Sequence, residues 1–203
     1  MAKQPRGKTV RRLGINLYGN PKYDRLLDRK PNTPGKARGA RTRSKMSVYG
    51  EQLKEKQKFR FAYGMTERQF RNLYKNASRM TGATGDNMIS LMERRFDNTI
   101  FRMGFAVSRA QARQMVSHGY FYINGKLANI PSMYVKTGDV ITTREKKGIE
   151  ALIRKNLSAS TSKKGSWIEL DDEKLSAKIV VLPQVTDVQP VGKIQSVVEF
   201  YSK

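Results

Sequence analysis

The middle of the chain carries a pattern of residues at helical spacing. Within residues 47–62, Leu53, Gln57 and Phe61 stand four positions apart with Glu and Lys between them, a pattern typical of an α-helix. Gly64 follows where such a helix would end. We therefore predict a long helix over this segment.

A second predicted helix begins after Thr66, which stands three residues before Gln69 as in a capping box. Its apolar residues recur at intervals of three and four, so they mark one buried face. The opposite face is basic. The apolar positions are Phe70, Leu73, Tyr74 and Ala77, and the basic positions are Arg68, Arg71, Lys75 and Arg79.

A third helix is predicted from about Asp86 to Met103, between the polar break TGATGD and Gly104. Its apolar positions also fall on one face. We expect these aromatic and methionine side chains to form core rather than a surface on which bases stack. The positions are Ile89, Met92, Phe96, Ile100 and Met103.

A helix followed by a hairpin comes next. Ser108 and Gln111 form a second capping box, and Gly119 stands where a left-handed helix C-terminal cap is expected. The stretch YFYI-NG-KLA then predicts a β-hairpin, because Asn-Gly supplies both positive φ angles of a type I′ turn. The core side of the helix would hold Ala112, Met115 and Val116, and the opposite side Arg109, Arg113 and Ser117.

Strand-like composition dominates the rest of the chain, apart from a helix predicted at 149–157. Segments rich in β-branched residues predict strands at 140–145, 166–171, 177–183 and 197–202.

We therefore predict an α+β protein with three parts. Residues 1–45 form a basic, partly extended arm. Residues 46–93 and 142–203 form a helical and β body. Residues 94–141 form an inserted ααβ unit with a hairpin sheet.

Charge narrows the range of partners. The chain has 40 Lys and Arg against 17 Asp and Glu, a formal net charge of +23, and the excess lies before residue 161. Such an excess favours a polyanion, either nucleic acid or an anionic membrane. No apolar run approaches the roughly 20 residues that span a bilayer, and the first residues lack the apolar core of a secretory signal. Nucleic acid is the better interpretation, and no membrane is expected.

The residues needed for catalysis are scarce. Cysteine is absent and His118 is the only histidine, which excludes disulfides, thiol nucleophiles and cysteine zinc sites. At a helix C-terminus, His118 would be favoured as the imidazolium and could contact phosphate or cap carbonyls. The chain also lacks the GxxxxGK and GxGxxG phosphate-binding patterns. We predict no catalytic residue, no metal and no cofactor.

Arg109 and Arg113 are the sharpest candidates for phosphate contact. Residues four apart on a helix lie about 5–6 Å from each other, which is close to the spacing of neighbouring phosphates, and guanidinium groups bind phosphate bidentately. The alternative is a solvated helix face. The hairpin, with Lys126 at its turn, would brace the helix as a rigid support. Because no base-reading helix is evident, structured RNA fits best.

The arm offers a second grip on RNA. The stretch PNTPGKARGARTRSK has almost nothing apolar to bury, so we expect it to be mobile alone and to fold against phosphate. The alternative is a solvated basic tail. Tyr18, Tyr23, Leu26 and Leu27 predict one short ordered piece.

Residues 94–141 resemble the S4 RNA-binding module, which also occurs in pseudouridine synthases, tyrosyl-tRNA synthetases and a heat-shock protein. The flanks YGEQLKEKQKFRFAYGMTERQFRNLY and VVEFYSK resemble the ribosomal protein S4 family itself. The matching elements of the module are Arg95-Phe96-Asp97, Gly104, Ser108-Arg109, Ala112-Arg113, Gly119, Asn124-Gly125 and Gly138-Asp139.

This resemblance implies a primary binder of small-subunit ribosomal RNA that nucleates assembly of the subunit body at a junction in the 5′ domain. It also implies that the protein contacts ribosomal protein S5 and other small-subunit proteins, and that it lies near the channel where mRNA enters. The family influences decoding accuracy, and no homo-oligomer is required. The expected location is the cytoplasmic ribosome, with an organellar ribosome left open. Zinc, which some family members bind through N-terminal cysteines, is not carried over.

Two rival functions stay open. A docking subunit of an RNA-modifying enzyme would need a further catalytic domain, and an RNA chaperone would bind by charge alone. The candidate RNA-binding residues are Arg95, Arg109, Arg113, His118 and Lys126 in the module, Arg38, Arg41, Arg43 and Lys45 in the arm, and Arg68, Arg71 and Lys75 on the second helix.

Overall fold

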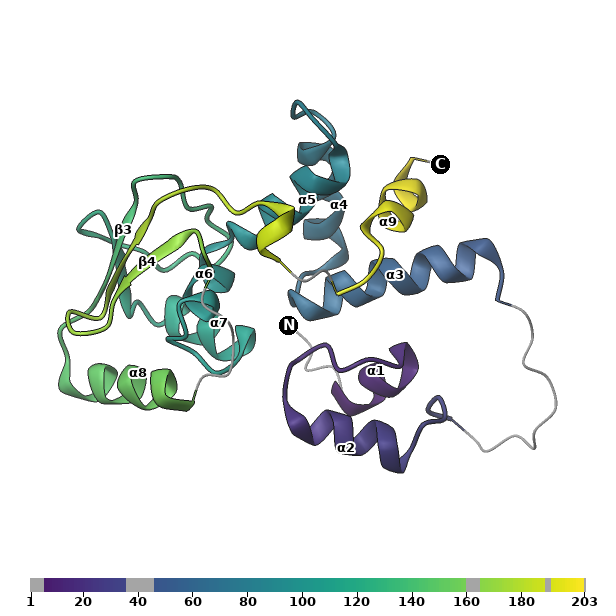
Figure 1. Ribbon diagram of the computed structural model, residues 1–203, viewed down its shortest axis with the longest axis horizontal. Coiled ribbons are helices and arrows are strands. Elements are labelled where there is room, and N and C mark those ends of the chain that lie inside the picture. Colours follow the sequence, from purple (N-terminus) through teal and green to yellow (C-terminus); the bar gives the residue numbers. More distant parts are fainter. Residues whose placement is uncertain (1–5, 36–45, 160–164, 189–190, 203) are drawn as a thin grey trace. The chain divides into compact units, whose positions relative to one another are not determined.

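The computed structural model describes residues 6–35, 46–159, 165–188 and 191–202 (Figure 1). Contacts divide the chain into two compact units. Unit 1 comprises residues 1–67 and 190–203, and unit 2 comprises residues 68–189. These boundaries differ from the three-part division expected from the sequence.

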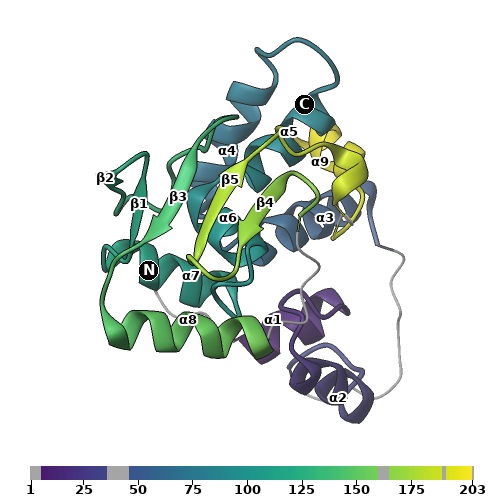
Figure 2. The same cartoon turned by 60° about the vertical axis from the view of Figure 1, so that its left-hand side comes forward.

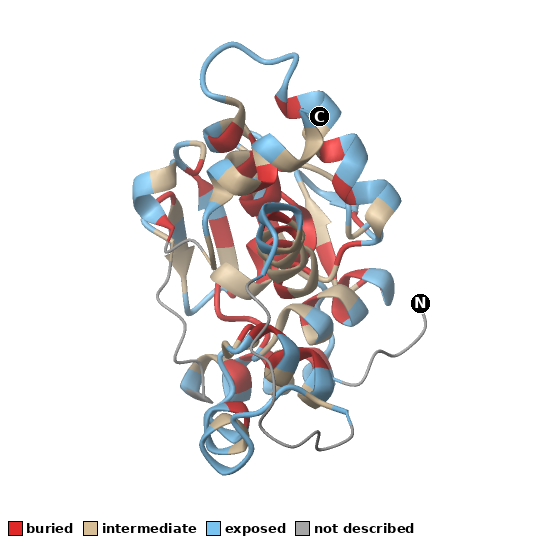
Figure 3. Cartoon of the chain, turned by 90° about the vertical axis from the view of Figure 1, so that its right-hand side faces the viewer, coloured by how far each residue is buried: buried red, intermediate tan, exposed pale blue. Residues whose placement is uncertain are grey.

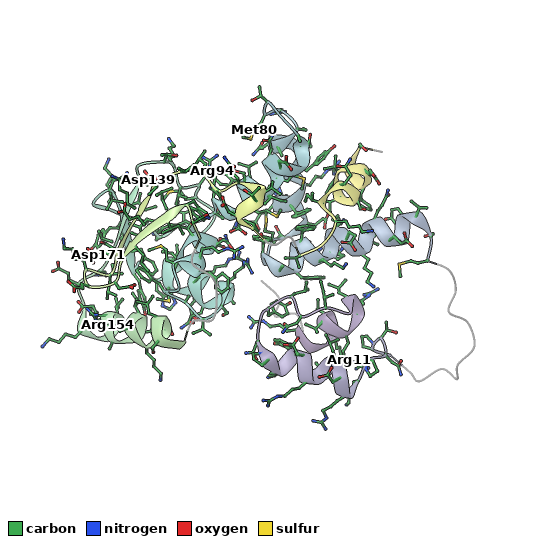
Figure 4. The ribbon with its side chains drawn as sticks, in the orientation of Figure 1. Arg11, Met80, Arg94, Asp139, Arg154 and Asp171 are labelled. Atoms are coloured by element: carbon green, nitrogen blue, oxygen red, sulfur yellow. The ribbon has the colours of Figure 1, made fainter. Side chains whose placement is uncertain are left out.

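The described part of unit 1 is helical. It contains α1 (Arg6–Leu13), α2 (Pro21–Arg29), α3 (Val48–Ala62) and α9 (Ile194–Tyr201). The helices α1 and α2 contact each other and bury Val10, Leu13 and Tyr23. Arg11, labelled in Figure 4, donates hydrogen bonds to the carbonyls of Lys30 and Asn32 just after α2. The predicted arm thus contains two packed helices rather than one short ordered piece.

The helix predicted at 47–62 is confirmed as α3. Ser47 caps it by accepting a hydrogen bond from the Gly50 N–H, and Gly64 follows its end with φ of +62°. Its buried positions are Gln52, Lys56, Phe59 and Ala62.

The strand predicted at 197–202 is wrong, because this segment belongs to helix α9. Val197 is fully buried, and the Phe200 ring lies 5.5 Å from that of Tyr49 on α3. The packing of α9 against α3 overrides the local strand preference of its β-branched residues.

Helix α4 (Glu67–Ala77) starts at the last residue of the first segment of unit 1 and continues into unit 2, where α5 (Thr84–Glu93), α6 (Phe96–Arg102) and α7 (Arg109–Ser117) follow. The single helix predicted from Asp86 to Met103 is wrong, since it is broken at Arg94 and Arg95. Arg95 has extended backbone and forms a β-bridge with Tyr134. Tertiary carbonyls, those of Met133 and Pro131, accept the N–H groups of Phe96 and Asp97 at the start of α6.

Five antiparallel strands form one sheet in the order β2-β1-β3-β5-β4. The central strand β3 pairs with the hairpin on one side, with Ile123 opposite Ile141, and with β5 on the other, with Ala177 opposite Ile141. The late strands therefore extend the hairpin sheet. The strands are β1 (Phe121–Ile123), β2 (Lys126–Leu127), β3 (Val140–Thr143), β4 (Ile168–Asp171) and β5 (Ser176–Ile179).

The predicted Asn-Gly turn is confirmed, with φ of +50° at Asn124 and +75° at Gly125. Asn124 also ties the turn to β3. Its side chain donates to Asp139, labelled in Figure 4, and accepts from the N–H of Val140.

Helices α6, α7 and α8 (Lys147–Ala159) pack with the sheet around one core (Figure 2). The core includes Phe96, Phe105 and Phe121, which are each fully buried, and the short η1 helix (Val185–Asp187) lies beyond β5. Buried and exposed positions alternate along the helices in Figure 3. No helix among the described residues is long and apolar enough to cross a membrane. The α+β class predicted from the sequence is confirmed.

Candidate nucleic-acid interface

Helix α7 begins and ends where its sequence predicts, but one hydrogen bond of the predicted capping box has a different partner. The Ser108 hydroxyl accepts from the N–H of Gln111 at 3.3 Å, and the Gln111 side chain accepts from the N–H of Val107 at 2.9 Å rather than from Ser108. Gly119, with φ of +69°, follows the last turn. These ends place Arg109 and Arg113 on the first two turns of the helix.

Arg113 lies against α6 instead of projecting from an open helix face. Its Nε and Nη2 both donate to Oδ2 of Asp97, with an Nε–Oδ2 distance of 2.8 Å, and its side chain is 25% exposed. The expectation that Arg113 projects from an open, solvated face of the helix is therefore wrong. An acid one helix away holds the guanidinium in place.

Arg109 is held in a similar way. Its Nε donates to Oδ1 of Asn98 at 2.7 Å, and its Cζ lies 4.7 Å from the ring centroid of Phe101. A guanidinium over an aromatic face gains cation–π attraction. Both α7 arginines thus have fixed positions at the boundary between core and solvent.

Arg95 does not belong to the surface. It is only 3% exposed, and its guanidinium forms a two-point ion pair with Asp97, with contacts of 3.1 and 3.0 Å. The structure therefore places the Arg95 guanidinium in the interior, paired with Asp97, and its contact with RNA stays a prediction. The close Arg-x-Asp spacing was the sequence signal for this pairing.

Arg102 and Glu93 form a second ion pair near these arginines. The helical periodicity of the sequence did not predict it. Nε and Nη2 of Arg102 donate to the two Glu93 oxygens at 2.8 Å each. Asn98 donates to Glu93 Oε2 at 2.7 Å. Glu93 is fully buried, and its place directly after Met92 in an apolar stripe was the available signal that it needed a buried cation.

The hairpin carries the next pair of candidates. His118 is the C-terminal cap residue of α7, exposed, with its ring perpendicular to that of Tyr120 at 5.9 Å. Lys126 is exposed at the start of β2. The next residue, Leu127, packs over Gly119, whose missing Cβ would lie 3.5 Å from it. The hairpin is thus in contact with the end of α7.

The basic face predicted on the second helix is exposed on α4, opposite buried Phe70, Leu73 and Ala77. It comprises Arg68, Arg71 and Lys75 on α4 and Arg79 two residues after its end. The arm candidates Arg38, Arg41, Arg43 and Lys45 lie outside the described residues.

The arrangement can attract phosphate without reading base edges. The network around α5, α6 and α7 contains four arginines and only two carboxylates, so the network as a whole is positively charged. The arginines are Arg95, Arg102, Arg109 and Arg113, and the carboxylates are Glu93 and Asp97. Guanidinium groups keep that charge at any physiological pH. The described residues contain no group of three or more acids and histidines that could hold a metal ion.

Comparison with known families divides the chain into two matches. Residues 1–93 match the family described as ribosomal protein S4/S9 N-terminal domain, and residues 94–141 match the S4 domain. The second match coincides with the segment that contains α6, α7 and the hairpin.

Comparison with individual proteins gives matches along the full length. The chain is 75% identical over 201 residues to small ribosomal subunit protein uS4 of Treponema denticola, covering 99% of this chain and 98% of the relative. It is 65% identical to uS4 of Treponema pallidum, with the same coverage. It is 46% identical over 200 residues to uS4 of Borrelia hermsii, covering 98% and 96%.

Proposed function

Since the chain belongs to the ribosomal protein S4 family, we infer that it is an RNA-binding structural constituent of the small ribosomal subunit. The observation that carries this inference is the match along nearly the whole of both chains, at 75% identity to a small-subunit protein. An S4 module alone would also suit an RNA-modifying enzyme. Here residues 1–93 match a ribosomal family, and the small-subunit relatives match the module together with both of its flanks, which favours a structural role over catalysis.

The proposed contacts are with phosphate. Arg109 and Arg113 on α7, with Lys126 on the hairpin, would meet the backbone of a folded RNA, as would His118 at the C-terminal end of α7. Arg68, Arg71 and Lys75 on α4 would add a second basic face. Fixed cations on helices can match the shape of an RNA fold more selectively than charges on a flexible tail.

The finer parts of the proposal follow from family membership. We propose that the chain binds small-subunit ribosomal RNA early, at a junction in the 5′ domain, and so nucleates assembly of the subunit body. We also propose that the chain contacts ribosomal protein S5, lies near the channel where mRNA enters and influences decoding accuracy. The relatives named above come from bacteria, which favours the cytoplasmic ribosome and lends no support to an organellar one.

The test compares binding to a 5′-domain fragment of small-subunit ribosomal RNA with binding to an unrelated structured RNA of equal length. Affinities are measured over a series of salt concentrations. We expect a preference of about 4 kcal/mol or more, as for other specific nucleic-acid complexes, and it should persist at high salt.

The charge-only alternative predicts a different pattern. A chaperone that binds through its net charge of +23 would bind both RNAs equally, and salt would remove its affinity for each. That outcome would replace the ribosomal function with a general one.

A further inference from the structure

Two carboxylates are buried beneath the arginines of α6 and α7. Asp97 is 2% exposed and Glu93 is 0% exposed. Burial of a carboxylate is unfavourable unless cations and hydrogen-bond donors compensate it. Near a surface that binds a polyanion, a negative charge also opposes binding. Charge alone therefore does not explain why acids occupy these positions.

Asp97 connects an interior arginine to an outer one. Arg95 donates through Nε to Oδ1 at 3.1 Å and through Nη2 to Oδ2 at 3.0 Å. Arg113 donates through Nε to the same Oδ2 at 2.8 Å. The side chains of Asp97 and Arg95 are 3% and 4% exposed, whereas that of Arg113 is 25% exposed. The acid thus holds the one arginine of this trio that reaches solvent.

Glu93 repeats this arrangement. It accepts two hydrogen bonds from Arg102, whose side chain is 18% exposed. It also accepts from Asn98, which in turn accepts from Arg109 Nε at 2.7 Å. Each buried acid therefore holds a partly exposed guanidinium, and Asn98 extends the second network to Arg109.

The trio of Arg95, Asp97 and Arg113 carries a net positive charge. Arg95 by itself balances the charge of Asp97, so Asp97 can fix Arg113 through hydrogen bonds while a net positive charge remains on the trio. An arginine held in this way loses less side-chain freedom when it binds phosphate than one that is mobile in solution. Preorganisation of this kind favours binding even though an acid supplies it.

We propose that Asp97 is a positioning residue for RNA binding, which orients the guanidinium of Arg113 toward an RNA phosphate. Glu93, with Asn98, serves Arg102 and Arg109 in the same way. This inference rests on the proposed RNA-binding function, and it predicts that removal of a negative charge weakens binding to a polyanion.

The experiment is a double-mutant cycle on the full chain with Asp97→Asn and Arg113→Ala, and the 5′-domain ribosomal RNA fragment as the probe. Loss of a charge-assisted contact should weaken binding about tenfold for each single variant. The slope of log affinity against log salt should fall by about 0.7–0.9 in each. In the Arg113→Ala background, Asp97→Asn should have almost no further effect on affinity. A purely structural role would leave the salt slope of the folded protein unchanged.

Two variants serve as controls. Glu173→Gln makes the same change of charge at an exposed position between β4 and β5, and it should bind as the wild type does or slightly more tightly. Arg113→Lys keeps the charge and leaves the Arg95–Asp97 pair intact. Because an ammonium lacks the planar fork of donors, Arg113→Lys should lose most of the affinity that Arg113→Ala loses.

A folded Asp97→Asn variant that binds RNA as tightly as the wild type, or more tightly, overturns the proposal. If this variant unfolds because Arg95 is left unpaired, Arg113→Lys decides, and wild-type affinity in that variant overturns the proposal as well. A wild type without preference for the ribosomal RNA is a distinct result, which overturns the RNA-binding function itself.

Discussion

At the scale of single residues, Glu67 joins three segments of unit 1. It lies at the start of α4 and accepts hydrogen bonds from Lys56 Nζ at 2.8 Å, Arg60 Nη1 at 3.2 Å and Tyr201 Oη at 2.7 Å. Burial by itself raises the pKa of Glu67. The hydrogen bonds from Lys56, Tyr201 and Arg60 outweigh that effect, so the pKa is lowered overall.

This lowered pKa makes the stability of unit 1 depend on pH. A carboxyl with a lower pKa in the folded state stabilises the fold above its unfolded pKa of about 4.3, and the contribution is lost as pH falls through the folded value. We expect Glu67→Gln to lower the free energy of unfolding at pH 7 by about 1 kcal/mol or less, because the side chain is 43% exposed. At pH 3 the difference should shrink. Denaturant unfolding at both pH values measures it.

Asp28→Asn provides the matched control, since Asp28 is an exposed acid on α2 of the same unit. Its unfolding free energy should stay within about 0.5 kcal/mol of wild type at both pH values. A Glu67→Gln variant whose deficit is equal at pH 7 and pH 3 would show that the carboxylate charge is not the cause.

The sequence predicted apolar residues better than buried polar ones. Ile89 and Met92 are buried on α5 as expected, because helical period decides which side chains of one helix share a face. Phe96 is buried as well, but on the separate helix α6. The burial of Arg95 was not foreseen. Arg95 is buried because it pairs with Asp97 and forms a β-bridge with Tyr134. The periodicity of apolar residues contains no information about such a distant backbone partner.

At the scale of elements, substitutions at two glycines can test the effect of backbone conformation without a change in packing. A Cβ added at Gly125, in the hairpin turn, or at Gly148, near the start of α8, would meet no atom within 4 Å. The φ of Gly125 is +75°, whereas that of Gly148 is not in the left-handed region. An alanine at either site therefore changes the backbone preference and little else.

We expect opposite effects from the two substitutions. Gly125→Ala should lower the free energy of unfolding by about 1–2 kcal/mol, the cost of a left-handed conformation with a Cβ. Gly148→Ala should raise it by about 0.5 kcal/mol, because alanine has less freedom to lose in a helix. Thermal unfolding of both variants measures the difference, and a shift of the same sign in both would contradict the conformational explanation.

The elements that sequence reasoning misassigned are those whose state is set by distant contacts. The Asn124-Gly125 turn was predictable because its two residues favour that geometry locally. Helix α9 was not, since Val197 and Val198 favour strands and only the packing of the segment on α3 makes it helical. The break before α6 likewise contains neither glycine nor proline.

At the scale of the whole molecule, the two units differ in how the chain builds them. Unit 2 is one continuous segment and contains the cluster of buried residues from Phe96 to Ile179. Unit 1 combines segments from both ends of the chain. A core formed within one segment is the property expected of an independently folding domain.

A fragment of residues 66–189 should therefore fold alone. We expect one cooperative thermal transition and a free energy of unfolding of roughly 5 kcal/mol or more. Residues 1–67 without α9 should be less helical alone, and addition of a peptide of residues 190–203 should restore helicity, measured by circular dichroism. A fragment 66–189 without a cooperative transition would show that its core needs unit 1.

The contact between α3 and α9 also has a consequence for protein synthesis. Gln52 on α3 donates to Glu199 on α9, and Glu55 accepts from the N–H of Lys193. These partners are more than 130 positions apart in the chain. During translation, α3 leaves the exit tunnel long before α9 has been made. Unit 2 can fold while the chain is still growing, whereas unit 1 must wait for its last helix. A nascent chain that stalls before residue 190 would present an uncovered α3 to the chaperones of the cell.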